Sequence, residues 1–207
     1  MHIDRVVRLG TDALLVEVPD SATATALFET ARDRISVEDV LDIVPAARTV
    51  LFDGVADRDA LAEEIAGWTL FPDDVAPARP QGESVDVPVV YDGPDLAEVA
   101  DRWQMSVEEA VAAHSATEFT VAFCGFAPGF AYCTGLAERL HVPRRPDPRT
   151  RVPAGSVGLA GEFTGIYPSA SPGGWQLIGH TGLGLWDVDR DPPATLPPGT
   201  RVRFVPR

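Results

Sequence analysis

The sequence predicts an α+β domain over residues 1–82, followed by a mainly-β domain over residues 83–207. Three observations support this fold class. The chain has 207 residues and a hydrophobic content of 45%, which is enough to build two small cores. Residues 71–84 hold three prolines and one glycine among few apolar residues, a composition typical of a linker. After this segment, short apolar runs alternate with loops rich in glycine and proline, which indicates strands joined by shaped turns.

The first domain is expected to open with a β-hairpin. Two apolar runs, residues 6–9 and 13–18, flank the turn composition Gly10-Thr11-Asp12. A helix should follow, because apolar residues repeat at helical spacing over positions 24–31, and Ser21 or Thr23 is placed to cap it. Two further strands are expected, over residues 40–44 and 49–52. Asp57 then precedes a second helical pattern that Gly67 helps to end.

The second domain is expected to open with a strand and two helices. Alternating apolar positions over residues 85–91 predict the strand. Asp95 begins one helical pattern. Ser106 begins another as a capping box with Glu109, and His114 stands near its end. Apolar runs over residues 119–123 and 175–178 predict strands, and a tight turn at residues 197–200 precedes a last strand.

Composition excludes several classes of function. The net charge of -14 disfavours a nucleic-acid-binding protein, because such binding relies on basic residues that neutralise phosphates. All 17 basic residues are arginine, so the chain contains no P-loop lysine, no Schiff-base lysine and no biotin-carrying lysine. Phosphate or carboxylate groups must therefore be bound by arginine, by backbone amides or by another protein of a complex.

The sequence predicts a cytoplasmic protein without a membrane partner. No stretch approaches the roughly 18 apolar residues of a membrane span, and the first residues lack a signal-peptide pattern. The two cysteines, Cys124 and Cys133, are expected to be reduced thiols. A buried structural role is favoured for both over a reactive one.

A basic segment over residues 139–151 is the strongest candidate for an anion site. It contains five arginines and a single acid, Asp147, although residues 1–82 and 83–207 carry net charges of -9 and -5. A basic loop on an acidic protein attracts anionic ligands. The alternative is a solvated loop whose arginines form ordinary surface ion pairs.

The remaining candidates for chemistry are few. The four histidines show no metal-site spacing, so no metal is expected. His114 is the preferred proton carrier or substrate donor, with a helix-end histidine bonded to backbone carbonyls as the alternative. Ser156 lies in Ala-Gly-Ser-Val-Gly, which lacks the spacing of a nucleophile elbow, but its hydroxyl and neighbouring amides suit anion binding. Several aromatic residues are candidates for pocket walls or for the core, namely Phe126, Phe130, Tyr132, Tyr167 and Trp175.

Three blocks of sequence together resemble one known family. They are residues 125–132 (GFAPGFAY), residues 143–157 (PRRPDPRTRVPAGSV), and residues 164–175, which run from TGIYP to SPGGW. This combination is similar to the family that contains the B subunit of the bacterial ATP-dependent 5-oxoprolinase, the sporulation kinase inhibitor KipI and the protein named allophanate hydrolase subunit 1. A related pair of domains forms the carboxyltransferase part of urea carboxylase. The resemblance covers nearly the whole chain.

The resemblance implies a fold, partners and an activity. It implies a small α+β N-terminal domain and a cyclophilin-like β-barrel C-terminal domain. It implies a complex with 5-oxoprolinase subunits A and C that opens 5-oxo-L-proline to L-glutamate with ATP hydrolysis, in which this chain is inactive alone. The alternative function is a regulatory protein that inhibits a sensor histidine kinase.

The resemblance, together with the chemistry of the residues in the basic segment and the glycine-rich loops, implies the roles of individual residues. The expected catalytic residues are His114, Arg144 and Arg145, with both arginines and Arg151 binding a carboxylate or phosphate. The other expected substrate-binding residues belong to the glycine-rich loops and their surroundings: Gly125, Phe126, Pro128, Gly129, Tyr132, Ser156, Ser171, Gly173, Gly174 and Trp175.

Overall fold

The computed structural model describes residues 3–36, 38–68 and 84–207, and the chain divides into two units, Met1–Arg79 and Pro80–Arg207. Each unit is described by itself. The predicted linker and the domain boundary after residue 82 lie outside the described residues, so the division into domains at that point stays a prediction.

The first unit contains a four-stranded antiparallel sheet in the order β1-β2-β4-β3, within its described residues. The strands are β1 (Arg5–Leu9), β2 (Ala13–Glu17), β3 (Asp42–Pro45) and β4 (Thr49–Asp53). β1 and β2 form the predicted hairpin, with Leu9 opposite Ala13 across a turn in which Gly10 has a φ of 52°. β3 and β4 form a second hairpin, so all four predicted strands are confirmed.

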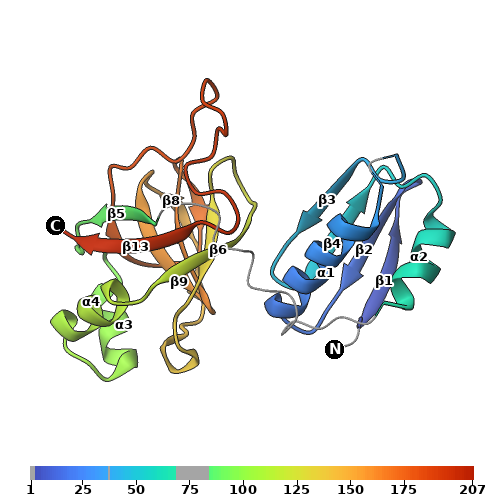
Figure 1. The fold of residues 1–207 in the computed structure, drawn as a ribbon. Helices are drawn as coiled ribbons and strands as arrows, with labels where there is room; N and C mark the ends of the chain where they lie inside the picture. The colour runs from blue at the N-terminus through green and yellow to red at the C-terminus, as the bar shows by residue number, and fades with distance from the viewer. Residues whose placement is uncertain (1–2, 37, 69–83) are drawn as a thin grey trace. The chain divides into compact units, whose positions relative to one another are not determined.

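Two helices belong to this unit, α1 (Ser21–Arg34) and α2 (Arg58–Ala66) (Figure 1). The predicted cap of α1 was wrong: the N-cap is Asp20, whose carboxylate accepts the backbone N–H of Thr23 at 2.8 Å. The carboxylate of Asp20 is as good an acceptor for a backbone N–H as the hydroxyl of Ser21. The cap therefore lies one residue before the predicted Ser21. Asp57 caps α2 as expected. Apolar side chains of both helices and the sheet, such as Leu27, Phe52 and Ile65, form one core.

The second unit is a nearly closed mixed β barrel with the strand order β12-β9-β10-β7-β6-β13-β5. Neighbouring strands are antiparallel except β5 and β13. The two edge strands meet at a bridge between Val90 and His180, whose N–H and C=O groups exchange two hydrogen bonds of 2.9 Å. The strands are β5 (Val85–Val89), β6 (Phe119–Cys124), β7 (Ala131–Thr134), β9 (Ser156–Ala160), β10 (Phe163–Ile166), β12 (Gln176–His180) and β13 (Arg201–Pro206). The barrel confirms the mainly-β prediction, and its cyclophilin-like character stays a prediction.

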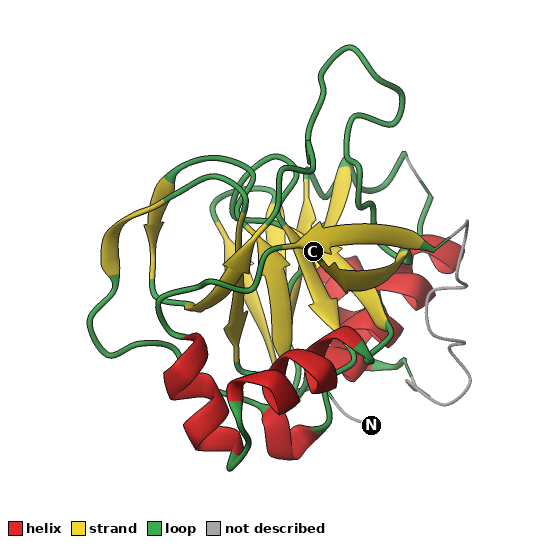
Figure 2. Ribbon diagram, turned by 90° about the vertical axis from the view of Figure 1, so that its left-hand side faces the viewer, coloured by secondary structure: helices red, strands yellow, loops and turns green. Residues whose placement is uncertain are grey.

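Two helices, a two-stranded ribbon and a short 3-10 turn complete this unit. The helices α3 (Leu96–Trp103) and α4 (Val107–Ser115) pack against β12 and β13 respectively (Figure 2). The predicted capping box of Ser106 and Glu109 begins α4. The ribbon pairs β8 (Arg149–Val152) with β11 (Ser171–Gly173), and the 3-10 turn η1 spans Glu138–Leu140.

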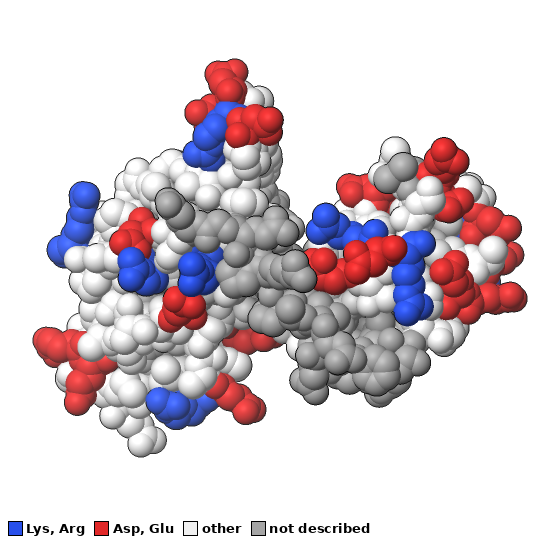
Figure 3. Space-filling view, viewed as in Figure 1, with Lys and Arg blue, Asp and Glu red and all other residues white. Residues whose placement is uncertain are grey.

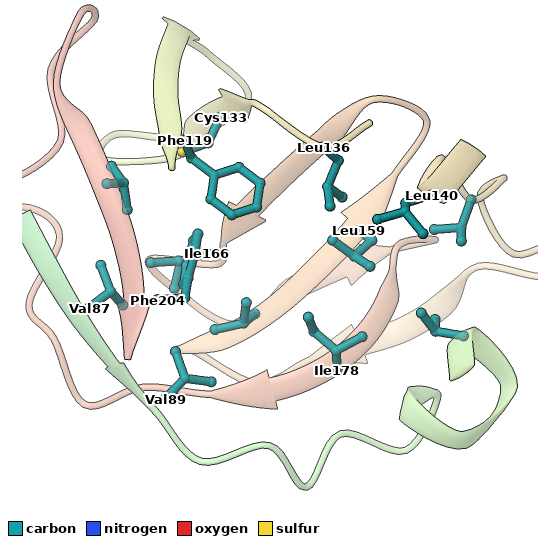
Figure 4. Close-up of a cluster of buried hydrophobic side chains, with 14 of the residues drawn as sticks. Val87, Val89, Phe119, Cys133, Leu136, Leu140, Leu159, Ile166, Ile178 and Phe204 are labelled. Carbon is teal, nitrogen blue, oxygen red and sulfur yellow. The ribbon is translucent and has the colours of Figure 1, made fainter. Parts of the chain in front are cut away.

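The barrel interior is the main core. Side chains from strands distant in sequence point toward one another there, among them Val87, Phe119, Ile178 and Phe204 (Figure 4). Helix residues such as Val99 and Trp103 belong to the same cluster. In the part of the chain that the structure describes, no helix has the length and apolar character that crossing a membrane requires.

The surface charge agrees with the composition. Acidic groups predominate on the visible face of the first unit, and charged groups also mark the tip of the loop between β12 and β13 (Figure 3). That loop carries Asp187, Asp189, Arg190 and Asp191, while Val188 next to them is 78% exposed.

Candidate functional site

The loop between β6 and β7 is built from two consecutive tight turns. The N–H of Ala127 donates to the carbonyl of Gly125 at 2.8 Å, and Phe126 at the centre of this γ-turn has a φ of 69°. The N–H of Phe130 then donates to the carbonyl of Ala127 at 2.9 Å, across Pro128 and a Gly129 with a φ of 82°. Proline followed by a residue with positive φ is the arrangement of a type II turn.

Backbone strain is concentrated at Phe126. A phenylalanine with positive φ is unfavourable by about 1–3 kcal/mol, and such residues cluster at ligand sites. The side chain is 63% exposed, so burial of its ring does not offset this strain. The turn instead holds the ring edge-on to Phe130 and Tyr167, with centroids 5.4 Å and 6.4 Å away.

Gly129 is required at its position for two reasons. Its φ is positive, and a Cβ there would lie 2.9 Å from the carbonyl oxygen of Leu185 and 3.0 Å from the Cβ of Trp186. The β6–β7 loop is therefore packed against the loop that follows β12. Gly129, Pro128 and Gly125 shape this loop but do not line the cavity described below.

Aromatic rings from three segments form one continuous wall. Phe130 is the central member, with Tyr132, Tyr167 and Trp175 at centroid distances of 4.9, 5.2 and 5.3 Å. Aromatic pairs in tilted and edge-to-face arrangements add stabilisation beyond their buried area. The two interpretations of these residues from sequence, core and pocket wall, are both correct, because Phe130 and Trp175 are buried and also line a cavity.

The opposite side is formed by the arginine-rich segment and the loop that leads into β12. The N–H of Arg145 donates to the carbonyl of Gly174 at 2.7 Å, which holds the two segments together. A Cβ on Gly173 would collide with the Tyr167 hydroxyl, so only glycine lets this loop approach the aromatic wall.

These segments enclose a cavity of about 80 Å³, which we call the aromatic cavity. Its lining residues come from all three blocks of the family resemblance: Phe126, Phe130, Tyr132, Arg144, Tyr167, Pro172, Gly173, Gly174 and Trp175. Arg144 is the only charged residue among them. The volume is below the 300–1,000 Å³ typical of complete ligand pockets. The chemistry suits a small, flat organic anion.

The two tyrosines of the aromatic cavity are neutral at physiological pH. Burial raises the pKa of Tyr132 above its ordinary value, and the nearby positive charge of Arg144 opposes this shift. Burial likewise raises the pKa of Tyr167, against a hydrogen bond from the Trp175 backbone and the charges of Arg144 and Arg149. Both hydroxyls therefore keep a proton that can be donated in a hydrogen bond.

The arginines are not gathered into one pocket, in contrast to the expectation from sequence. Arg145 and Arg149 both bind the carboxylate of Asp95, with N···O distances of 2.9 and 2.7 Å. Arg151 is exposed on β8 and does not line the aromatic cavity. Arg144 is the one arginine of the segment that lines this cavity, because the buried Asp95 attracts its neighbours.

His114 lies in the barrel core rather than at the aromatic cavity. Its side chain is 1% exposed and packs against Phe119 and Phe204. The Tyr91 hydroxyl lies 2.7 Å from its Nδ1, and the hydroxyl of Thr164 lies 3.5 Å from its Nε2. Burial lowers the pKa of His114 to about 3, so the expectation of a proton carrier near neutral pH is not supported.

Both expected serines lie outside the lining of the aromatic cavity. Ser156 is buried in β9, where its carbonyl accepts the N–H of Tyr167 at 2.9 Å. Ser171 lies on β11, and its buried hydroxyl has no hydrogen-bond partner in the described part of the chain. Their assignment as substrate-binding residues gains no geometric support.

The cysteines are free, and each is held as an un-ionised thiol. Burial raises the pKa of Cys124 to about 11 and that of Cys133 to about 12. The Sγ of Cys124 donates to the carbonyl of Leu196 at 3.4 Å. Within residues 3–36, 38–68 and 84–207, no group of three histidine, cysteine, aspartate or glutamate residues is arranged to hold a metal ion.

Larger hollows lie elsewhere on the described residues, and two of them have volumes above 400 Å³. One of about 420 Å³ lies between α1 and the segment leading into β3, and one of about 410 Å³ lies beside the barrel seam at Val90 and His180. Neither is lined by residues of the three sequence blocks. The aromatic cavity is smaller, but it alone of the three combines shaped turns, an aromatic wall and an arginine without an ion pair to a described residue.

Sequence reasoning missed the role of Asp95. The sequence predicts only that Asp95 begins a helix, and it does precede α3, but its side chain makes no capping hydrogen bond. Its partners Arg145 and Arg149 are 50 and 54 positions away. No local pattern reports such a distant contact, and the only available signal was the excess of arginine in the basic segment.

The comparisons with known proteins agree with these blocks. The family described as carboxyltransferase domain, subdomain C and D, matches residues 5–196. The protein named as the B subunit of 5-oxoprolinase in Escherichia coli O157:H7 is 39% identical over 217 residues, covering 100% of this chain and 98% of that protein. Its namesake in Haemophilus influenzae is 37% identical over 209 residues, covering 97% and 96%.

Solved structures place the same module in longer chains. The crystal structure of TTHA0988 has a TM-score of 0.74 and 34% identity, covering 95% of this chain and 40% of that one. Kluyveromyces lactis urea carboxylase has a TM-score of 0.69 at 18% identity, covering 99% of this chain and 23% of that one, which supports the fold alone. The resemblance found in the sequence motifs is confirmed, and the chain belongs to the carboxyltransferase family of subdomains C and D, together with proteins named as the B subunit of 5-oxoprolinase.

Proposed function

We propose that this chain is the B subunit of an ATP-dependent 5-oxoprolinase, which opens 5-oxo-L-proline to L-glutamate in a complex with subunits A and C. Full-length similarity to proteins named as the B subunit of 5-oxoprolinase supports this assignment. The single structural observation that carries it is the aromatic cavity, which combines five aromatic rings with the guanidinium of Arg144.

The substrate fits the chemistry of this cavity. 5-Oxoproline is a flat five-membered lactam with one carboxylate. The Arg144 guanidinium binds that carboxylate, because a planar fork of N–H donors matches two carboxylate oxygens. The rings of Phe126 and Trp175 cover the faces of the lactam, and the neutral hydroxyls of Tyr132 and Tyr167 hydrogen-bond its amide.

ATP does not fit the aromatic cavity. A triphosphate needs several cationic or amide donors, and the cavity offers one charged lining residue and a volume of about 80 Å³. The chain also has no lysine for a phosphate-binding loop. We therefore assign nucleotide binding to another protein of the complex, and this chain alone is inactive. The alternative function, inhibition of a sensor kinase, gains no support from the names of the matched relatives.

A reconstituted complex tests the proposal. The chain is mixed with its cognate A and C subunits, and ATP-dependent release of glutamate from 5-oxo-L-proline is measured. We expect turnover only with all three proteins present. A verified complex that releases no glutamate contradicts the assignment, and tight binding to a sensor kinase would replace it with the inhibitor.

A substitution then tests the site. Arg144→Gln should raise KM for 5-oxoproline by about 10- to 100-fold, because a charge-assisted hydrogen bond contributes about 1.5–3 kcal/mol. Arg139→Gln is the matched control, since Arg139 is an exposed arginine of the same segment and does not line the aromatic cavity. Equal KM values for the two variants would show that the carboxylate binds elsewhere.

A further inference from the structure

The Asp95 carboxylate binds three groups from two distant segments. Its Oδ1 accepts from Nη1 of Arg145 at 2.9 Å and from Nη2 of Arg149 at 2.7 Å. Its Oδ2 accepts from the backbone N–H of Leu177 at 2.7 Å. The Asp95 side chain is 4% exposed, whereas those of Arg145 and Arg149 are 30% and 23% exposed. This is a buried anion whose two oxygens are both engaged.

These partners lie next to the lining residues of the aromatic cavity on both of its sides. Arg145 follows Arg144 directly, and its N–H bonds the carbonyl of Gly174 at 2.7 Å. Leu177 follows Trp175 by two residues on β12. Asp95 itself is absent from the lining of the cavity. The Asp95 side chain thus holds both the segment of Arg144 and the segment of Trp175 in place, although Asp95 itself does not contact a ligand in the cavity.

The charges explain why Arg144 stays available. Asp95 is already bound by two arginines, which lie closer to it than any third cation of the segment. The other acid there, Asp147, is exposed and forms no ion pair within the described residues. Without Asp95, Arg145 and Arg149 would lose their anionic partner, and Nε of Arg145 and Nη1 of Arg149 are already buried without an acceptor in that part of the chain. The segment would then move to let them reach water.

We propose that Asp95 is a positioning residue of the aromatic cavity, which holds the segment of Arg144 and the start of β12 at the separation that a carboxylate-bearing ligand requires. The catalytic consequence rests on the proposed 5-oxoprolinase function, whereas the positioning itself does not. A residue that only positions the substrate-binding arginine should affect KM more than kcat.

Two isosteric variants of the full chain test the proposal. Asp95→Asn removes the charge and keeps the shape of the side chain. Asp86→Asn is the matched control, because Asp86 binds Arg203 at 2.7 Å in an exposed ion pair of the same unit, far in sequence from the cavity segments. Hydrogen–deuterium exchange with mass spectrometry reports on peptides that cover residues 143–151 and 172–178, and on peptides from β6 and β13 as internal references. Kinetics of the reconstituted complex report KM and kcat.

In Asp95→Asn, we expect about tenfold faster exchange in the two cavity peptides only, and a KM raised about tenfold with kcat within about threefold. Asp86→Asn should match the wild type in both measurements. Equal acceleration of exchange throughout the barrel would overturn the proposal and indicate a general structural role. Unchanged exchange in the cavity peptides, or a decrease confined to kcat, would also contradict the proposal.

The exchange measurement separates this proposal from the proposed function, since it needs no substrate. A wild-type complex without 5-oxoprolinase activity would contradict the proposed function. The exchange experiment would still test the positioning role of Asp95. If Asp95→Asn does not fold, Arg149→Gln carries the same test, because it removes one ion pair and leaves the Asp95 carboxylate its other two partners.

Discussion

The two units of this chain treat polar side chains differently. Among the described residues, the first unit buries one polar side chain, Thr23, which bonds Asp20 three positions away. The barrel unit buries seven, including Asp95 and His114, whose partners lie 23 to 82 positions away. The buried polar bond of the first unit is local, whereas the buried polar groups Asp95 and His114 of the barrel bond to residues that are distant in sequence. The barrel is also the unit that contains the candidate site.

The aspartates that precede α2 and α3 show the same difference at single residues. Asp57 accepts the backbone N–H groups of Asp59 and Ala60 at 3.1 and 3.0 Å, as an N-cap does. Asp95 occupies the same position relative to α3 but binds two arginines and β12 instead. Identical local patterns thus acquire different roles, because the tertiary structure of the barrel brings cations to one of them.

Acid should destabilise the barrel unit through His114. The folded pKa of about 3 lies below the ordinary value of 6.5, so the unfolded chain binds more protons between these two pH values. Stability present above pH 6.5 is therefore lost progressively as pH falls towards 3, so the free energy of unfolding should be about 3 kcal/mol lower at pH 4.5 than at pH 7.5. Chemical unfolding of the full chain, followed from about pH 7.5 to about pH 4.5, measures this loss.

The control is His114→Gln, which removes the titrating group. The variant should be less stable near neutral pH but should lose less stability than the wild type on acidification. If the free energy of unfolding depends on pH in the same way for both proteins, the barrel tolerates a charged His114. The burial of His114 would then not distinguish the barrel from the first unit.

Replacing Asp95 and Asp57 by alanine should show how much stability comes from a long-range ion-pair network and how much from a local helix cap. Asp95→Ala should lower the free energy of unfolding of the barrel unit by about 3 kcal/mol, because two mostly buried guanidinium groups lose their partner. Asp57→Ala should cost the first unit about 1 kcal/mol, the usual value for a lost N-cap. Denaturant titrations of both variants give these values, and equal costs would contradict the contrast.

The smallest expected effect concerns backbone strain. The described residues contain two non-glycine residues with positive φ, Gln104 and Phe126, and both belong to the barrel unit. Replacing either by glycine relieves an unfavourable conformation but adds freedom to the unfolded chain. We expect the free energy of unfolding to stay constant or to rise by about 1 kcal/mol in each variant, as measured by denaturant titration.

Activity then distinguishes these two residues. Phe126→Gly should weaken binding of 5-oxoproline to the reconstituted complex, because the ring lines the aromatic cavity. Gln104→Gly should leave binding unchanged, since Gln104 only ends α3. A Phe126→Gly protein that loses stability and keeps its affinity would show that the ring supports the fold rather than the site.

Much of the fold could be predicted from sequence. The hairpins, the capping box and the amphipathic helices follow from short-range patterns, and the aromatic and glycine residues of the aromatic cavity are visible as motifs. The cap of α1 was assigned to the wrong residue, because Asp20 and Ser21 offer similar acceptors to the same first turn. The closure of the barrel between Val90 and His180 leaves no local signal.

The sequence by itself determined the family, part of the secondary structure and the set of residues from which a site is built, because these depend on neighbours along the chain and on shared motifs. The short strands between Ala131 and Gly173 were not predicted, since they lie in segments rich in glycine and proline. Only the tertiary structure decided which of the adjacent residues Arg144 and Arg145 lines the aromatic cavity and which binds Asp95. It likewise placed His114 in the core rather than at the site. The physical reason is that ion pairing and desolvation depend on which groups are brought within a few ångströms, which residue order alone does not specify.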